Sequence, residues 1–136
     1  MWLYYKIRNI LVDVWYKFHC RCQRFMRGWS DGDVWNMDDW FIDTVEPMLK
    51  HLRDHGYAAP ENLCSEDDTR EPWEDILTEM INCAHFMNRD NARMALGIFR
   101  MAPMNHQDHE RINNLVDENK NRFFELFSQY FWDLHD

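Results

Sequence analysis

Apolar residues recur three or four positions apart along most of the chain, which is the spacing of one face of an α-helix. Ile7, Val14 and Phe18 belong to the first such series, with polar residues between them. This series predicts a helix over about residues 2–27 that ends at Gly28, where a left-handed backbone closes many helices.

The periodicity continues to the C-terminus. Ser30 or Asp31 is expected to cap the second helix, Pro47 to kink or restart it, and Gly56 to end it. Its inward face is predicted to consist of Val34, Met37, Phe41, Val45, Met48 and Leu52. The remaining pattern predicts a loop after Gly56. The helices after the first are expected over about residues 31–55, 69–88, 92–101 and 106–134. The polar residues 88–91 are expected to form a break or a bend, and Asn105 or Asp108 to cap the last helix, whose apolar period includes Phe127, Phe131 and Leu134.

Composition agrees with a helical fold. The chain has 136 residues, enough for one domain, and its four Gly and four Pro are too few for the many turns of a short-stranded β fold. Seven Trp and nine Phe supply bulky core material. We therefore predict an all-α fold: one single-domain bundle of residues 1–136, with four main amphipathic helices and one short helix.

Charge is distributed unevenly along this predicted bundle. Residues 1–27 contain six basic residues and one acidic residue, a net charge of +5, whereas the whole chain carries −9. Residues 31–90 carry sixteen carboxylates and four basic side chains, a local charge of −12. Such an acidic region repels nucleic acid and favours basic partners. The simpler interpretation is solubility, with the basic first helix as an internal counterweight.

The first helix is not a membrane span, because Lys6, Arg8 and Asp13 interrupt its apolar stretch well short of the ~20 residues that a bilayer core requires. Its basic residues opposite an apolar stripe also suit the surface of an anionic membrane. A small bundle would, however, use the same stripe as core.

Histidines and cysteines raise the question of a metal site. Cys20 and Cys22 are two residues apart, which turns them to different faces of a helix, and His51 is followed by Leu52 rather than by the glutamate of the His-Glu-x-x-His motif. We predict surface histidines and reduced thiols, and neither a metal nor another cofactor.

Catalytic motifs are missing from the sequence as well. The four glycines do not form a phosphate-binding loop, and no Gly-x-Ser-x-Gly elbow occurs. Asp38, Asp39 and Asp43 make an acidic edge, which a solvated helix face explains more simply than general acid–base chemistry. We predict that the protein is not an enzyme.

Tryptophans are the other candidate for function. Trp29, Trp35 and Trp40 cannot share one helix face, so at least one is expected to be exposed, and exposed tryptophans anchor protein interfaces. The alternative, to which we give equal weight, is that all three tryptophans have only a structural role. Together with the acidic positions they give the predicted partner-binding set: Asp31, Asp33, Trp35, Asp38, Asp39, Trp40, Asp43, Glu71, Glu74 and Asp75.

The stretch Arg27-Gly28-Trp29-Ser30-Asp31-Gly32-Asp33-Val34-Trp35 resembles the signature of a group of small bacteriophage-encoded proteins of unassigned role, Arg-Gly-aromatic-Ser/Asp-Asp-x-Asp-Val-aromatic. Residues 73–81 and 124–134 resemble the central and closing helices of that group. The resemblance implies a phage or prophage origin and assigns no catalytic residues. In physical terms the signature predicts a helix junction in which Asp33 meets an arginine such as Arg27.

Three functions follow from these observations. The first is a non-catalytic phage accessory protein that binds a basic surface of a host protein. In the most specific form of this hypothesis, the protein mimics DNA and inhibits a nucleic-acid-binding defence system such as a CRISPR effector. The second is a membrane-surface accessory protein that uses its first helix. The third and weakest is a metal-dependent hydrolase. The expected location is the cytoplasm of an infected or lysogenic bacterium.

Overall fold

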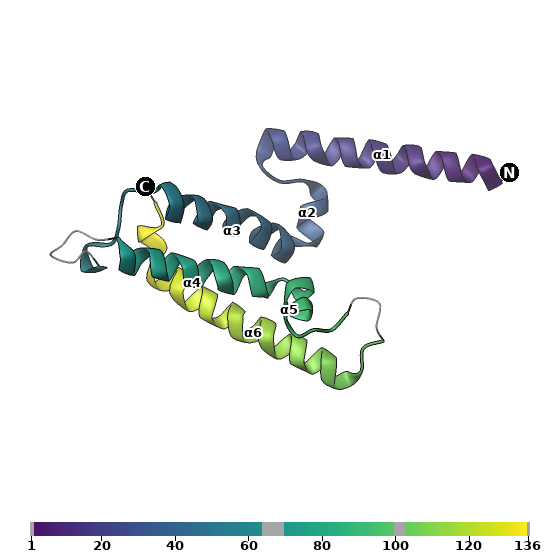
Figure 1. Ribbon diagram of the computed structural model, residues 1–136. Helices are drawn as coiled ribbons and strands as arrows, with labels where there is room; N and C mark the ends of the chain where they lie inside the picture. The colour runs from purple at the N-terminus through teal and green to yellow at the C-terminus, as the bar shows by residue number, and fades with distance from the viewer. Residues whose placement is uncertain (1, 64–69, 100–102, 136) are drawn as a thin grey trace. The chain divides into compact units, whose positions relative to one another are not determined.

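In a computed structural model of the chain, the structure describes residues 2–63, 70–99 and 103–135. These residues form helices and no strand, so the predicted all-α fold is confirmed (Figure 1). The helices are α1 (Trp2–Arg27), α2 (Asp31–Trp35), α3 (Met37–His55), the 3-10 turn η1 (Glu61–Leu63), α4 (Glu71–Met87), α5 (Arg89–Ala95), α6 (His106–Gln129) and the 3-10 turn η2 (Phe131–Asp133).

Several helix ends follow the predicted capping signals. Gly28, after α1, has a φ of 79°, a left-handed conformation that glycine adopts without steric cost. Gly56 follows the last residue of α3, as predicted. Asn105 precedes α6, and its side chain accepts a hydrogen bond of 2.8 Å from the backbone amide of Asp108. Local signals therefore fix these boundaries.

The predicted second helix is divided in two. It breaks at Asn36, whose φ of −131° and ψ of 56° are not helical, whereas α3 continues through Pro47. Within α3, Ile42 and Leu49 are the buried residues, and Phe41, Val45 and Leu52 of the predicted face pack against the core, whereas the predicted Met48 is 65 % exposed. The predicted inward face was thus wrong for Met48, as it was for Val34 and Met37, which are also exposed.

The fifth helix also lies earlier than predicted. The chain breaks after α4 at Asn88, whose side chain accepts hydrogen bonds from the amides of Asp90 and Asn91, and α5 follows directly. The predicted helix over 92–101 therefore begins at Arg89 and ends at Ala95.

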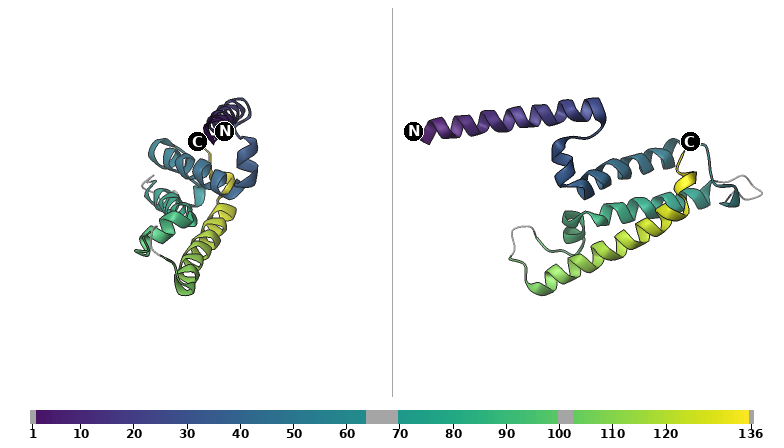
Figure 2. Two further views of the ribbon diagram at one scale, coloured as in Figure 1. Left: turned by 90° about the vertical axis from the view of Figure 1, so that its right-hand side faces the viewer. Right: turned by 180° about the vertical axis from the view of Figure 1, so that it is seen from behind.

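The chain forms two compact units, residues 1–40 (unit 1) and residues 41–136 (unit 2). In unit 2, α4 and α6 lie side by side in both views (Figures 1 and 2). They are antiparallel, because the Trp73 ring contacts that of Tyr130 while Glu79, further along α4, pairs with Arg122, earlier in α6. The core of unit 2 is buried mainly between these two helices: Leu49, Trp73, Leu77, Met80, Ile81, Cys83, Ala84, Phe123, Leu126 and Tyr130.

Aromatic and polar contacts attach α3 to this pair. The Phe41 ring lies edge-on to that of Phe123, with centroids 6.0 Å apart, and Leu49 is buried in the core. Arg53 reaches the Thr78 hydroxyl at 3.5 Å. Because Glu46 lies 3.7 Å from His85, further along α4, α3 is antiparallel to α4.

Unit 1 contains α1 and α2 and buries little apolar surface. Cys20 is buried, whereas the apolar residues of α1 from Ile7 onward are exposed, from 50 % at Ile7 to 93 % at Phe25. Within unit 1, the stripe predicted as bundle core is therefore largely uncovered.

Candidate functional site

The phage-type signature forms the junction between α1 and α2, and the carboxylate of Asp33 lies at its centre. Asp33 is buried and pairs with the Arg24 guanidinium, whose Nε donates a 2.9 Å hydrogen bond. The amide and hydroxyl of Ser30 donate to the same carboxylate at 2.7 and 2.8 Å. The hydrogen bond from Arg24 holds the pKa of Asp33 far below its usual range, with Ser30 adding to the effect. Asp33 thus acts as an internal anchor.

Asp31 has internal partners too. Gln23 donates a 2.6 Å hydrogen bond to its carboxylate and Arg27 forms an ion pair with it, and both lower the pKa of Asp31. Arg27 also lies over the Trp29 ring, 3.8 Å from its centroid. The predicted contact of Asp33 with Arg27 is therefore replaced by one with Arg24, which lies one turn earlier on α1.

Close packing at this junction depends on a small residue in α2. A Cβ atom on Gly32 would lie 3.0 Å from the Tyr16 hydroxyl oxygen and 3.8 Å from the Cys20 sulfur. A side-chain hydrogen bond with Cys20 raises the pKa of Tyr16. Residues 16, 20, 23, 24 and 27 therefore define the side of α1 that faces α2.

A second part of unit 1 exposes tryptophan beside acid. Trp35 is 87 % exposed, which confirms that at least one of the three tryptophans lies at the surface. Asp38 and Asp39 are exposed within four positions of it. Their neighbours in sequence help to line a recess of about 290 Å³, which is formed by Trp29, Asp33, Val34, Met37 and Trp40. We call Trp35, Asp38, Asp39 and this recess the Trp35 surface.

The other four predicted partner-binding residues belong to unit 2. Glu71, Glu74 and Asp75 lie in the first turns of α4, and Glu74 is 3.7 Å from Arg70. Asp43 is exposed on α3, one turn before Glu46, which contacts His85 near the other end of α4. Glu71 lies about 21 Å along α4 from His85 at 1.5 Å per residue, so the structure does not bring Asp43 together with the acids of α4.

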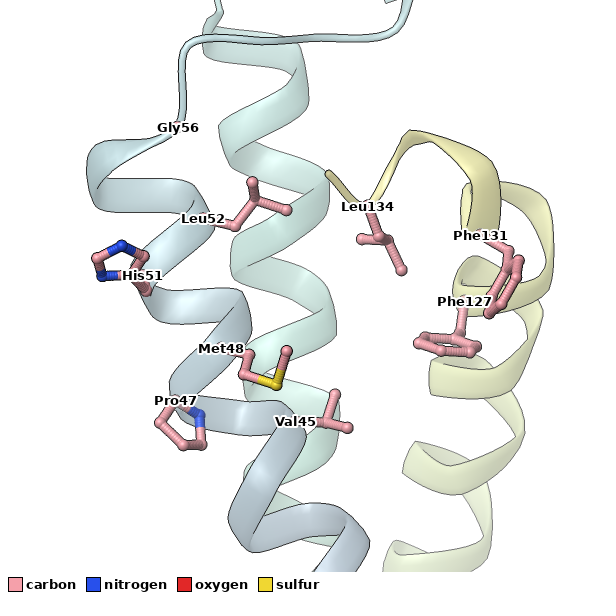
Figure 3. Close-up of a pocket in the computed structure, with 9 residues that line it drawn as sticks. All are labelled: Val45, Pro47, Met48, His51, Leu52, Gly56, Phe127, Phe131 and Leu134. Carbon is pink, nitrogen blue, oxygen red and sulfur yellow. The ribbon is translucent and has the colours of Figure 1, made fainter. Parts of the chain in front are cut away.

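Unit 2 also has an apolar groove that the sequence interpretation missed. Val45, Met48 and Leu52 of α3 face the residues at the end of α6 and after it across a space of about 640 Å³ (Figure 3). The residues from that side are Phe127, Phe131 and Leu134. Their helical period was visible in the sequence, but it was assigned to closed core.

Among the described residues, no three His, Cys, Asp or Glu side chains lie close enough together to hold a metal ion. His51 and His55 stack on each other, with ring centroids 4.5 Å apart. Cys20, Cys22 and Cys83 are free thiols, and burial raises the pKa of Cys83, which disfavours a reactive thiolate. Cys64 lies outside the described residues.

Within the part of the chain that the structure describes, each helix is too short or too polar to cross a lipid bilayer. Comparison with protein-family models, with curated proteins and with solved structures finds no match to this chain. The resemblance to phage proteins therefore stays a prediction.

Proposed function

We propose that the protein is a non-catalytic phage accessory protein that binds a host protein through the Trp35 surface. The observation that carries this proposal is the nearly complete exposure of Trp35 beside Asp38 and Asp39. A large aromatic ring held at the surface of a short helix offers contact area at low conformational cost, and tryptophans dominate the binding energy of many interfaces.

Charge defines the class of partner. Asp31 and Asp33 are paired internally, so the carboxylates that the Trp35 surface offers are those of Asp38 and Asp39. The apolar lining of the recess suits an aliphatic or aromatic side chain, and the exposed carboxylates of Asp38 and Asp39, which lie in sequence between the lining residues Met37 and Trp40, suit lysine or arginine. The partner is thus a protein with an apolar side chain set in a basic surface.

Affinity capture from a bacterial host lysate tests this proposal, with the wild-type chain compared with Trp35→Ala and Trp132→Ala. Trp132 is a matched control, because it is 84 % exposed but belongs to η2 in unit 2. A specific partner is retained by the wild type and by Trp132→Ala and depleted by Trp35→Ala, with a loss of about 2 kcal/mol in binding free energy.

Binding measurements with the purified partner then test the electrostatic contribution to the affinity. Asp38→Asn/Asp39→Asn is expected to weaken binding, and added salt to reduce the wild-type affinity. Competition by duplex DNA would support the DNA-mimic form. Equal capture by all three proteins, or no specific partner at all, would contradict the proposal.

A further inference from the structure

The apolar face of α1 lies on the side of the helix opposite its contacts with α2. Gln23 and Arg24 bond Asp31 and Asp33, and Cys20 lies against Gly32. At 100° per residue, Val14 lies about 120° from Cys20 around the helix axis, on the side turned away from α2. The face consists of Ile7, Ile10, Leu11, Val14, Phe18 and Phe25, which are 50–93 % exposed.

Basic side chains lie at both edges of this face. Lys17 is exposed at one edge and Arg8 at the other, and the helix as a whole carries +5. Arg21 is exposed near the Lys17 edge, between the angular positions of Ile10 and Val14. Trp15, 68 % exposed, lies between the apolar residues and Arg8. Long basic side chains can extend from such edges to reach phosphate groups while their aliphatic stems cover apolar surface.

We propose that α1 binds the surface of an anionic lipid membrane with this apolar face. Charge complementarity selects that occupant, because basic residues border the face and lipid phosphates attract them. Pairing with α1 of a second copy would bring +5 against +5. The combination of a Phe-bearing apolar face, a tryptophan and basic residues along its border, and low overall hydropathy is typical of helices that lie in the plane of a membrane interface. This inference uses other residues than the Trp35 surface and stands independently of it.

Flotation of the full chain with lipid vesicles tests the proposal. We expect co-flotation with vesicles of 3:1 phosphatidylcholine and phosphatidylglycerol, and much less with pure phosphatidylcholine. Lys17→Gln/Arg21→Gln is expected to lower the partition coefficient on anionic vesicles on the order of 25-fold. Trp35→Ala is expected to leave it unchanged, which separates this result from that of the partner experiment.

Two valines of α1 provide a matched pair. Val12 and Val14 are both 59 % exposed, but only Val14 belongs to the apolar face. Val14→Asp and Val12→Asp change the net charge equally, so a difference between them reports insertion of the face. Val14→Asp should bind anionic vesicles at least about tenfold more weakly than Val12→Asp. Circular dichroism checks that both variants stay helical.

Three outcomes would overturn the proposal. They are the absence of flotation on either vesicle, equal binding by the two valine variants, and a dimer in sedimentation experiments that Val14→Asp dissociates while the wild type does not float. The last outcome would assign the face to a second copy of the chain.

Discussion

At the residue scale, Asp33 connects the end of α1 to the start of α2. Its carboxylate accepts from a guanidinium, a backbone amide and a hydroxyl, so the ionised form has partners that water would otherwise supply. Removing it leaves Arg24 without this carboxylate and Ser30 without an acceptor for its amide. The signature is therefore explained by structure before any ligand is considered.

This arrangement predicts a pH dependence. The folded pKa of Asp33 is lowered, so its ion pair stabilises unit 1 fully above the unfolded pKa of about 3.9, and the stabilisation is lost progressively as pH falls from there through the folded pKa. Asp33→Asn should reduce the hydrogen-exchange protection of the α2 amides at pH 6. The difference from the wild type should shrink by pH 2.5.

Asp38→Asn is the control for this experiment, because Asp38 is exposed beside the same helix. It should leave the protection of α2 near the wild-type level at both pH values. A constant effect of Asp33→Asn from pH 6 to 2.5 would contradict the assigned ion pair.

The sequence predicted that an aspartate and an arginine meet at this junction, but not which arginine is the partner. Both Arg24 and Arg27 lie on the side of α1 that faces α2, one turn apart, and spacing alone does not choose between them. The choice depends on the path of the chain through Gly28 and Trp29, which sequence periodicity does not describe. The exposure of at least one of the three tryptophans could be predicted, because residues at those offsets cannot all be buried by one neighbour, but the offsets do not single out Trp35.

At the element scale, α5 shows why one helix was placed wrongly. Residues 88–91 are polar and were interpreted as a break, but Asn88 caps a new helix at once. Buried Ala92 then gives that helix its contact with the rest of unit 2. A polar run that contains a capping residue can begin a helix as well as interrupt one.

The cap leads to a second prediction. Asn88→Ala should destabilise unit 2 by about 1 kcal/mol, since the amides of Asp90 and Asn91 lose their acceptor. Asn88→Ser or Asn88→Asp should retain most of the stability because both can accept these bonds. Urea unfolding followed by circular dichroism measures the difference, and equal losses for all three variants would argue against capping.

The contact between α4 and α6 leads to a third. Phe123 is fully buried and stacks on Phe127 with centroids 5.6 Å apart, whereas its neighbour Phe124 is 45 % exposed. Phe123→Ala should cost about 3–5 kcal/mol through lost burial and a residual cavity. Phe124→Ala should cost clearly less in the same urea experiment. Similar losses at both positions would mean that the assigned face of α6 is wrong.

Most other elements could be predicted because their signals are local. Gly28, Gly56 and Asn105 act through the conformation or hydrogen bonding of their own backbone neighbourhood. The break at Asn36 could not be predicted, because the apolar spacing continues through this residue and only its non-helical backbone reveals the break. In the following helix the buried positions are Ile42 and Leu49, and Met48 lies outside them.

At the scale of the whole molecule, the distribution of apolar residues and of charge differs between the units. Periodicity identifies α1 as amphipathic, but it does not say what the apolar face contacts, and that is why the stripe was assigned to the core. Residues 41–136 carry −10, whereas α1 carries +5. The acidic partner-binding set was likewise predicted as one surface, although pairing removes two members and helix geometry separates others.

The composition of the core predicts that unit 2 folds without α1 and α2. Among the described residues, the buried cluster and the side chains packed on it all come from residues 41–134. A fragment of residues 37–136, which keeps α3 intact, should therefore unfold cooperatively in urea with a free energy within about 1 kcal/mol of the value for unit 2 in the full chain.

A shorter fragment, residues 56–136, serves as the contrast. It lacks α3 and thus removes Leu49, Phe41, Val45 and Leu52 from the core and its border. Loss of these apolar contacts should cost several kcal/mol, enough to unfold a domain of ordinary stability. If only the longer fragment unfolds cooperatively, the stability of unit 2 depends on α3, α4 and α6. The apolar face of α1 then has a purpose other than the core. Failure of the longer fragment to fold would instead support the prediction that the apolar stripe of α1 is part of the bundle core.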